Sequence, residues 1–456
     1  MKGNKNMNTK LSVVLACLLG ASPVIAQTKA LSLEDRVAEL EASQSLNMFT
    51  FGGFLGTRYD DVNVKQTTPA ATAFEGHTQH WRLTGGINAN ANVSNKIKFY
   101  STSAISKNFN SWNSQTAGAG TSATILSDPT DSRAEKGSQI YLEKIYADYK
   151  LTDSLVFSFG RLPTMDGPPS EMALGNARMG TYPSVGYNAP FDGFALSYNM
   201  PMEKQNLAFR VLYTPFTYYT TTVGKLAGNA PEGLGNVTIN GTKINSETAF
   251  GAAMVEYGID GTAVANKINV MLFAYQTGNL PIDGSQLSVG AGGSGLVEFK
   301  VGGQVLTTNF SGIAGSDFDL SLTYFQSKVD NSGDINVTGL GHIYGFGAVV
   351  QGDSLSGSTK LISARYKLGN TFIGAEYLDG GKSVFNYDPA TEVINGFYST
   401  TGTGSHAYVT HKLTPELALR LGYMKQDYKS TPFTFGASSD TDRTIATIYS
   451  SLRLDF

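Results

Sequence analysis

Cysteine is nearly absent from this sequence of 456 residues, with Cys17 as its single instance. Cys17 lies in an N-terminal segment that we expect to be removed, so the mature chain would have no thiol. Disulfide bonds and thiolate-ligated metal sites are therefore excluded. An exported chain without disulfides needs another source of stability, and a closed, hydrogen-bonded β-barrel provides one.

Strong charge and long apolar runs are also missing. Charged residues make up 16% of the chain, and without residues 1–26 it has 31 basic and 37 acidic residues, a formal net charge of −6. This mildly acidic balance does not suggest nucleic-acid binding. After residue 26 no apolar run reaches the roughly 20 residues that a transmembrane helix needs. Barrel strands stay possible, because half of each such strand is polar.

Residues 1–26 predict a signal peptide that is removed on export. Three lysines and no acid accompany an apolar run at 11–19, which is too short to span a bilayer. Val24 and Ala26 occupy the −3 and −1 positions of a small-residue cleavage site. A lipoprotein site at Cys17 is the less favoured alternative, because this residue lies inside the apolar run.

Residues 27–47 predict a short periplasmic helix. Ser32 can cap its N-terminus, with Asp35 three residues later. One apolar stripe follows, made by Leu33, Val37 and Leu40. The helix could lie alone at a barrel mouth, or it could be a coiled-coil fragment that joins three protomers. Both interpretations stay open.

From residue 48 to residue 456 the apolar residues recur at every second position. Trp81 and Ile87 lie on one face of such a segment, whereas Arg82 and Asn88 lie on the other. An aqueous lumen and a lipid exterior demand this two-faced strand. The pattern predicts an all-β fold, a transmembrane antiparallel β-barrel.

Short and long connections alternate along this region. Short turns are expected near 93–96, 151–154, 199–206, 259–267, 309–316, 368–370 and 413–416. Long polar loops are expected near 60–76, 107–136, 161–190, 215–246, 277–294, 329–357, 380–402 and 428–442. Seven turns and eight loops join about 16 strands, with both chain ends on the periplasmic, short-turn side. Fourteen or eighteen strands are the alternatives, because glycine-rich sequence blurs the pattern at 295–357.

The last predicted strand ends in an aromatic residue. Ile448, Leu452, Leu454 and Phe456 share one of its faces. An amphipathic final strand with a terminal aromatic resembles the signal that the outer-membrane assembly machinery recognises. We therefore expect Phe456 to act as an assembly signal and that machinery to be a partner of the chain.

The third long loop, 161–190, is polar and rich in proline, and we consider it a candidate pore constriction. Its acids are Asp166 and Glu171. Strand parity places several charged residues on the lumen face: Arg58, Arg82, Lys98, Lys144, Arg210, Arg365, Glu376 and Arg420. Our hypothesis is a transverse electric field between Asp166 and Glu171 and the wall cations Arg58, Arg82, Lys98 and Lys144. The alternative is a surface loop that rests on the rim.

Two resemblances point the same way. The Gly160-Arg161 junction before this loop is similar to that of general bacterial porins, whose third loop folds into the barrel and narrows it. The segment Gly-Arg-x-Pro-Thr-x-x-Gly-Pro-Pro at 160–169, with Arg178 to Pro183 and Phe191-Asp192-Gly193, resembles a little-characterised family of outer-membrane β-barrel porins. The resemblance is specific over about 157–193 and implies a pore, without indicating a solute.

No enzyme is expected. Gly352 to Leu355 matches the nucleophile block of Gly-Asp-Ser-Leu esterases, but neither His406 nor His411 has the aspartate three residues earlier that the family requires. The five histidines contain no His-Glu-x-x-His pair. We predict no catalytic, cofactor-binding or metal site.

The sequence as a whole therefore predicts a multi-pass protein of the bacterial outer membrane, surrounded by its lipid. The favoured function is a porin, as a homotrimer, for passive diffusion of small hydrophilic solutes and ions. A substrate-specific channel is the first alternative, with Tyr100, Tyr146, Tyr182 and Tyr187 as candidate guides. A closed barrel whose long loops serve in adhesion or partner binding is the second.

Overall fold

A computed structural model provides the structure of the chain. It describes residues 48–68, 71–109, 140–174, 178–215, 237–239, 242–244, 249–278, 280–283, 296–331, 354–386, 396–429 and 442–456. The predicted signal peptide (1–26) and the predicted helix (27–47) lie outside these residues.

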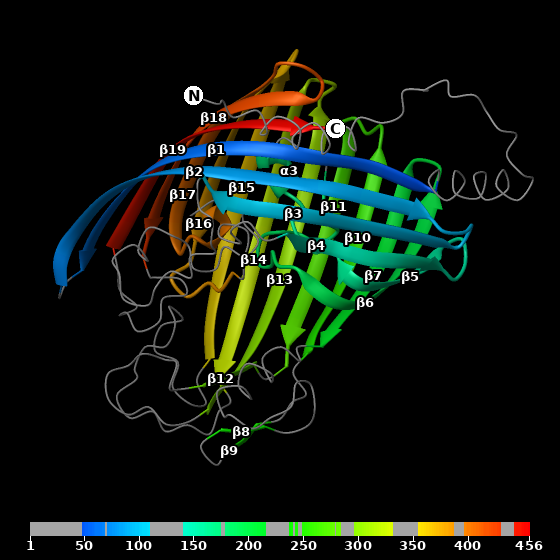
Figure 1. The fold of residues 1–456 in the computed structure, drawn as a ribbon, viewed down its shortest axis with the longest axis horizontal. Coiled ribbons are helices and arrows are strands. Elements are labelled where there is room, and N and C mark those ends of the chain that lie inside the picture. The colour runs from blue at the N-terminus through cyan, green and yellow to red at the C-terminus, as the bar shows by residue number, and fades with distance from the viewer. Residues whose placement is uncertain are drawn as a thin grey trace, which may run out of the picture. The chain divides into compact units, whose positions relative to one another are not determined.

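Sixteen antiparallel strands form one closed barrel, which confirms the expected fold class and strand number (Figure 1). They are β1 (Phe49–Thr68), β2 (Ala71–Asn92), β3 (Ile97–Asn108), β4 (Tyr141–Lys150), β5 (Leu155–Leu162), β6 (Phe191–Met202), β7 (Gln205–Pro215), β10 (Ala249–Asp260), β11 (Ala265–Thr277), β13 (Leu296–Ile313), β14 (Phe318–Asn331), β15 (Ser354–Leu368), β16 (Thr371–Gly380), β17 (Gly402–Lys412), β18 (Leu417–Tyr428) and β19 (Asp442–Asp455). Each pairs with the next, as expected for hairpin connections.

The barrel closes where β1 pairs with β19, from Phe54 opposite Asp455 to Thr67 opposite Asp442. Phe456 adds one further step, since its N–H donates to the Gly53 carbonyl oxygen at 2.9 Å and its own carbonyl oxygen accepts from the Gly53 N–H at 2.7 Å. Closure removes both sheet edges, so each strand has a hydrogen-bonded neighbour on either side.

Five small elements among the described residues lie outside this ladder. β12 (Leu280–Asp283) pairs with an extension of β13, and β8 (Val237–Ile239) pairs with β9 (Thr242–Ile244). The helix α3 (Ser170–Leu174) and the 3-10 turn η2 (Phe397–Ser399) belong to two loops discussed below. Within the described ranges no helix is long and apolar enough to cross a membrane.

Strand alternation follows the predicted pattern closely. Apolar side chains on one face of the strands are exposed on the barrel exterior. The large apolar residues exposed there include Trp81, Ile87, Leu272, Tyr377, Leu421 and Ile448. Polar side chains on the opposite face are buried in the interior, among them Arg82, Glu256, Thr323, Glu376 and Arg420. In the last strand Ile448, Leu452, Leu454 and Phe456 are all exposed on the outer face, as predicted.

The predicted loop at 60–76 is wrong. β1 runs to Thr68 and β2 starts at Ala71, so both strands continue through most of that range. Alternation persists there, because Val62 and Val64 are buried whereas Asn63 and Lys65 are exposed. The polar composition marks strands with a solvated outer face rather than a loop. The short turns at 203–204 and 261–264 lie within their predicted ranges, whereas the turn predicted near 309–316 is displaced to 314–317.

A β-bulge in β4 changes which acids face inward. The register shifts between Thr102 and Ser103 of β3, where Lys144 and then Leu142 stand opposite them and Glu143 is the extra residue. Glu143 is therefore buried, although strict alternation from Lys144 would turn it outward. Parity along the sequence could not reveal it, because a bulge leaves no period-two signal.

Candidate pore and its inward-folded loops

The third loop leaves the wall between β5 and β6 at a cross-strand pair of glycines. Gly160 has a φ of +116°, which L side chains rarely adopt, and a Cβ on Gly193 would lie 2.3 Å from the Tyr213 carbonyl oxygen. Beside them Arg161 Nε donates to Asp192 Oδ1 at 2.7 Å, between residues paired in the ladder. These contacts explain why the Gly-Arg and Phe-Asp-Gly ends of the motif occur together.

The two motif halves inside the loop pair with each other. The Thr181 N–H donates to the Pro163 carbonyl oxygen at 2.9 Å, and the Ser184 N–H donates to that of Pro168 at 2.9 Å. Gly167 allows this close approach, because a Cβ there would lie 1.6 Å from the Tyr182 carbonyl oxygen. The loop is thus a folded unit with its own backbone hydrogen bonds.

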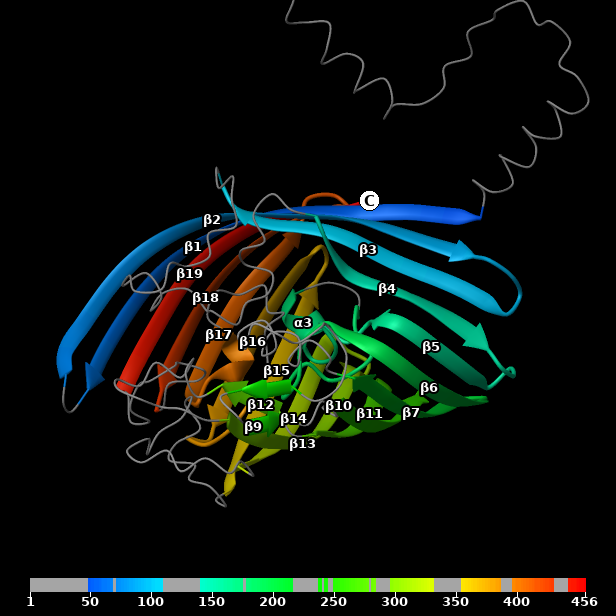
Figure 2. The same ribbon diagram turned by 60° about the horizontal axis from the view of Figure 1, so that its bottom comes forward.

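Aromatic side chains pack this unit against the inner wall. The ring of Tyr187 stacks on those of Phe191 and Phe250, with centroids 4.6 Å apart in both pairs. From β11, the Tyr275 hydroxyl donates to the Gly186 carbonyl oxygen at 2.9 Å. Tyr187 is 1% exposed, and Phe325 of β14 packs closely against Gly186. The third loop therefore lies inside the barrel, where Figure 2 shows α3 within the ring of strands.

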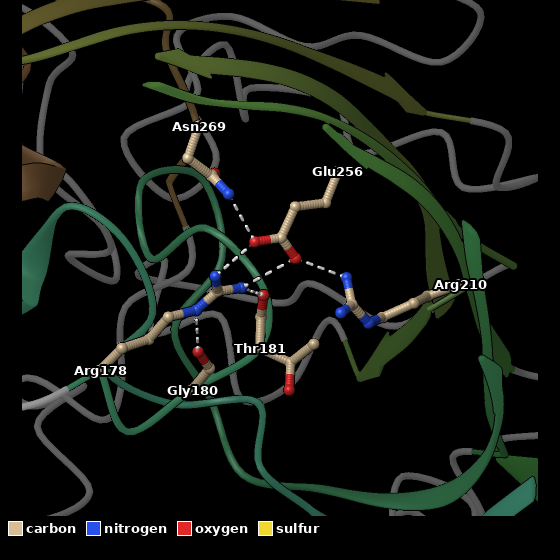
Figure 3. Close-up of polar contacts among 6 residues, drawn as sticks. All are labelled: Arg178, Gly180, Thr181, Arg210, Glu256 and Asn269. Carbon is tan, nitrogen blue, oxygen red and sulfur yellow. Dashed lines mark hydrogen bonds and ion pairs between the residues drawn. The ribbon is translucent and has the colours of Figure 1, made fainter. Parts of the chain in front are cut away.

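A charged cluster fixes the loop to β10 (Figure 3). Arg178 Nη1 lies 2.6 Å from Glu256 Oε1, and Arg210 Nη1 lies 2.6 Å from Glu256 Oε2. Asn269 Nδ2 also donates to Glu256 Oε1, at 2.9 Å. Arg178 further donates to the carbonyl oxygens of Gly180 and Thr181, so its guanidinium joins both the loop and the wall. Because Glu256 is 5% exposed, this pairing satisfies a carboxylate that would otherwise be costly to bury.

Of the predicted loop acids, Asp166 is buried and Glu171 is partly exposed. Asp166 is 4% exposed and has a φ of +54°, and it lines a cavity of about 50 Å³ together with Arg58 and Arg420. Burial raises the pKa of the Glu171 carboxyl, an effect that the positive charges of Arg178 and Arg365 oppose. The Glu171 Oε2 atom has no hydrogen-bond partner in the protein.

A second loop, between β16 and β17, also turns inward. Its residues Phe385 and Tyr398 are both 8% exposed, and the Phe385 N–H donates to Ser327 Oγ of β14 at 2.8 Å. Gln426 of β18 donates to Thr400 Oγ1 at 2.9 Å. We predicted this loop by its length, but nothing in the sequence separated it from loops that stay outside.

One buried polar chain connects this second loop to four strands, β15, β16, β17 and β19. Glu376 accepts hydrogen bonds from Tyr398 at 3.0 Å and from Ser363 at 2.8 Å. Its other oxygen lies 2.8 Å from His406 Nδ1, and His406 Nε2 lies 2.8 Å from the Tyr449 hydroxyl. The predicted inward direction of Glu376 is confirmed, but its partners could not be foreseen because they lie up to 30 positions from it in the chain.

A cavity of about 520 Å³ lies along the wall formed by β17, β18, β19, β1, β2 and β4. Basic residues dominate its lining, namely Arg58, Arg82, Lys144, Arg178, Lys412, Arg420 and Arg453, against Glu416 and Asp455. The third loop contributes Leu174, Arg178 and Met179 to this lining. Three of the four predicted wall cations therefore meet in one cavity.

The remaining predicted residues lie elsewhere. Lys98 is paired with Asp148 in the ladder and is not among the lining residues. Asp166 and Glu171 also do not line the 520 Å³ cavity. Among the described residues, no group of three His, Cys, Asp or Glu side chains could hold a metal ion.

The family model described as "Protein of unknown function (DUF3373)" matches residues 78–438. The chain belongs to this family. No curated protein matches it. The 16-stranded barrel of this DUF3373 member is similar to several solved structures.

An anion-selective porin from Comamonas acidovorans is 12% identical, with 90% of this chain and 99% of that chain covered and a TM-score of 0.47. OprB from Pseudomonas putida is 13% identical, with 92% and 97% covered and a TM-score of 0.43. A loop-deletion mutant of OmpT, an outer membrane protein of Vibrio cholerae, is 11% identical, with 90% and 100% covered and a TM-score of 0.45.

Proposed function

We propose that this protein is a porin of the bacterial outer membrane that lets small hydrophilic solutes and ions diffuse through a water-filled passage. The observation that carries the proposal is the basic-walled cavity of about 520 Å³ beside the inward-folded third loop. A barrel of 16 strands is wide enough for an aqueous channel. The apolar outer face, with residues such as Ile87 and Leu421 exposed, supports a lipid surrounding.

The loop narrows the lumen and contacts the wall at more than one place. Its aromatic cluster and Arg178 attach it to β10, β11 and β14, and the Tyr408 hydroxyl of β17 donates to the Met172 carbonyl oxygen at 2.8 Å. The cavity lies along the wall of β17, β18, β19, β1, β2 and β4. We place the constriction between this wall and the loop surface at Leu174 and Met179. Water and solutes would pass along the basic side of the cavity, because the like charges there concentrate the electric field.

Six residues remain the proposed constriction set, with different roles. Arg58, Arg82 and Lys144 face the passage, and Lys98 adds positive charge farther along the same wall. Asp166 and Glu171 contribute as charges within the loop at a distance from the passage, since neither of them lines the 520 Å³ cavity.

Charge reversal at Lys144 tests the passage in planar lipid bilayers. Lys144→Glu should shift the zero-current potential under a KCl gradient toward cation preference and change single-channel conductance by roughly a factor of two or more, because it replaces a cation in the lining. Lys204→Glu makes the same change in the exposed β6–β7 turn and should leave both values unaltered. Identical effects of the two variants would place the passage elsewhere, and a wild-type protein without conductance would favour a closed barrel with binding loops.

A substrate-specific channel is the second candidate, favoured by one aromatic pair. The rings of Tyr100 and Tyr146 stack with centroids 4.9 Å apart on the lumen side of β3 and β4. Tyr182 and Tyr187 are instead buried in the loop packing. A conductance that saturates with one solute and loses this property in Tyr146→Ala would support the specific channel over general diffusion.

A further inference from the structure

One arginine in the barrel interior lacks a hydrogen-bond partner. Arg420 of β18 is 7% exposed, and its Nε and Nη2 atoms have no acceptor in the protein. Its guanidinium lies 4.5 Å from the centroid of the Tyr408 ring, a cation–π contact that stabilises the charge and leaves these donors unsatisfied. Buried charged donors are costly without an acceptor, and the described residues do not supply one.

Arg420 belongs to a row of donors across four neighbouring strands. Ser451 is the ladder partner of both Arg420 and Arg58, and Thr410 is the partner of Arg420 on its other side. All four residues line the 520 Å³ cavity. Thr410 Oγ1 is also buried without a partner. Two guanidinium groups and two hydroxyls thus lie side by side on one stretch of the cavity wall.

A second row of cations lies two residues nearer the short turns. Arg453 and Lys412 are the ladder partners of Ala418 on its two sides, and both line the same cavity. The β-sheet brings these cations together from segments that are about 40 residues apart in sequence. Their combined field attracts anions toward Arg420.

The acids nearby have other partners. Asp60 lies 2.8 Å from Arg58 Nη2, and Asp455 lies 3.0 Å from Arg453 Nε. Glu376, which lines the 50 Å³ cavity with Arg420, holds His406, Tyr398 and Ser363 on its two oxygens. Within the described residues no carboxylate forms an ion pair with Arg420.

We propose that Arg420, together with Arg58, Ser451 and Thr410, forms an oxyanion-binding site on the pore wall. Guanidinium groups donate paired N–H groups in a geometry that matches phosphate and carboxylate oxygens, and hydroxyls can complete the shell. Arg420 borders both the 520 Å³ and the 50 Å³ cavities, so the site lies where the passage meets the loop. The inference rests on the proposed pore and specifies its favoured solutes as small oxyanions.

Anion block of chloride current tests the site in the full-length protein reconstituted in planar bilayers. Inorganic phosphate added to KCl should reduce the wild-type current in a saturable way, and Arg420→Gln should weaken this block by about tenfold or more. Arg420→Lys keeps the charge without the paired donors and should restore the block only in part. Acetate as a second blocker shows whether carboxylates share the site with phosphate.

Arg365→Gln is the matched control, since Arg365 is another inward arginine but already pairs with Asp319 at 2.8 Å. It should leave the phosphate block unchanged. A wild-type channel that conducts without block, or equal block in wild type and Arg420→Gln, overturns the site while leaving the pore intact. Heat-modified gel mobility identifies variants that fail to fold. If Arg420→Gln fails to fold, the phosphate block of Arg420→Lys is compared with that of wild type instead.

Discussion

At the residue scale, the interior of the barrel is organised by how each buried charge is compensated. Glu256 has two arginines and an asparagine, whereas Arg420 has only an aromatic face. Glu171 represents a third case, a loop carboxyl whose Oε2 is unpartnered. Buried charges that lack full compensation are where ligands or protons are expected to act.

Glu171→Gln should stabilise the protein at neutral pH. Burial raises the pKa of Glu171 in the folded state, so the folded chain binds more protons than the unfolded chain between the two pKa values. Stability therefore falls as pH rises through that window, and the charged Glu171 opposes folding above it. The amide removes this penalty, which we expect to be about 1–3 kcal/mol.

Thermal unfolding in detergent at pH 7.5 and below pH 4 measures the effect. The midpoint of Glu171→Gln should exceed that of wild type at pH 7.5 and match it in acid, where both side chains are neutral. Glu203→Gln in the exposed β6–β7 turn is the control. An equal gain at both pH values would show that the charge of Glu171 is not the cause.

At the scale of elements, the third loop behaves as a small folded unit with glycines at its tightest contacts. The motif that the sequence showed at 160–169 and 178–183 corresponds to two segments that pair backbone to backbone. The motif itself could be recognised in the sequence. The pairing could not, because the contacts depend on the loop turning back on itself and on a wall whose contacting residues lie up to 236 positions away, as Tyr408 does from Met172.

Gly167→Ala should loosen the third loop. The new Cβ would lie 1.6 Å from the Tyr182 carbonyl oxygen, a backbone atom that cannot move without breaking the pairing. We expect a loss of about 1–3 kcal/mol in stability, as for overpacked sites, with larger and noisier single-channel conductance. Gly251→Ala in β10 is the control, since its Cβ would have nothing within 4 Å. Equal conductance in the two variants would argue against a constricting loop.

At the scale of the whole molecule, Phe456 extends the ladder that closes the barrel. Phe456 forms two backbone hydrogen bonds with Gly53, and its ring is exposed on the outer face of the barrel. The backbone bonds contribute to joining the first and last strands. The exposed ring is available for the assembly role that we propose.

Removal of Phe456 and the substitution Phe456→Ala separate these two contributions. Deletion removes both hydrogen bonds, each worth about 1 kcal/mol, together with the ring, whereas Phe456→Ala removes the ring alone. If the aromatic ring is the assembly signal, both variants should reach the outer membrane several-fold less than wild type, and Phe456→Tyr should be normal. Normal levels of Phe456→Ala would instead assign the residue to closure only. Cross-linking of the assembled protein tests the proposed trimer in the same preparation.

Local alternation along the chain determined the barrel, its even strand number, the outer face and the inward direction of residues such as Arg82 and Glu376. Those features follow from the period of two, which any strand between lipid and water must keep. Only the tertiary structure decided which inward charges meet. The bulge at Glu143, the inward course of the second loop and the row from Arg58 to Arg420 depend on register and on strand neighbours distant in sequence. Register is set by the closure of the whole barrel, and no single segment contains that information.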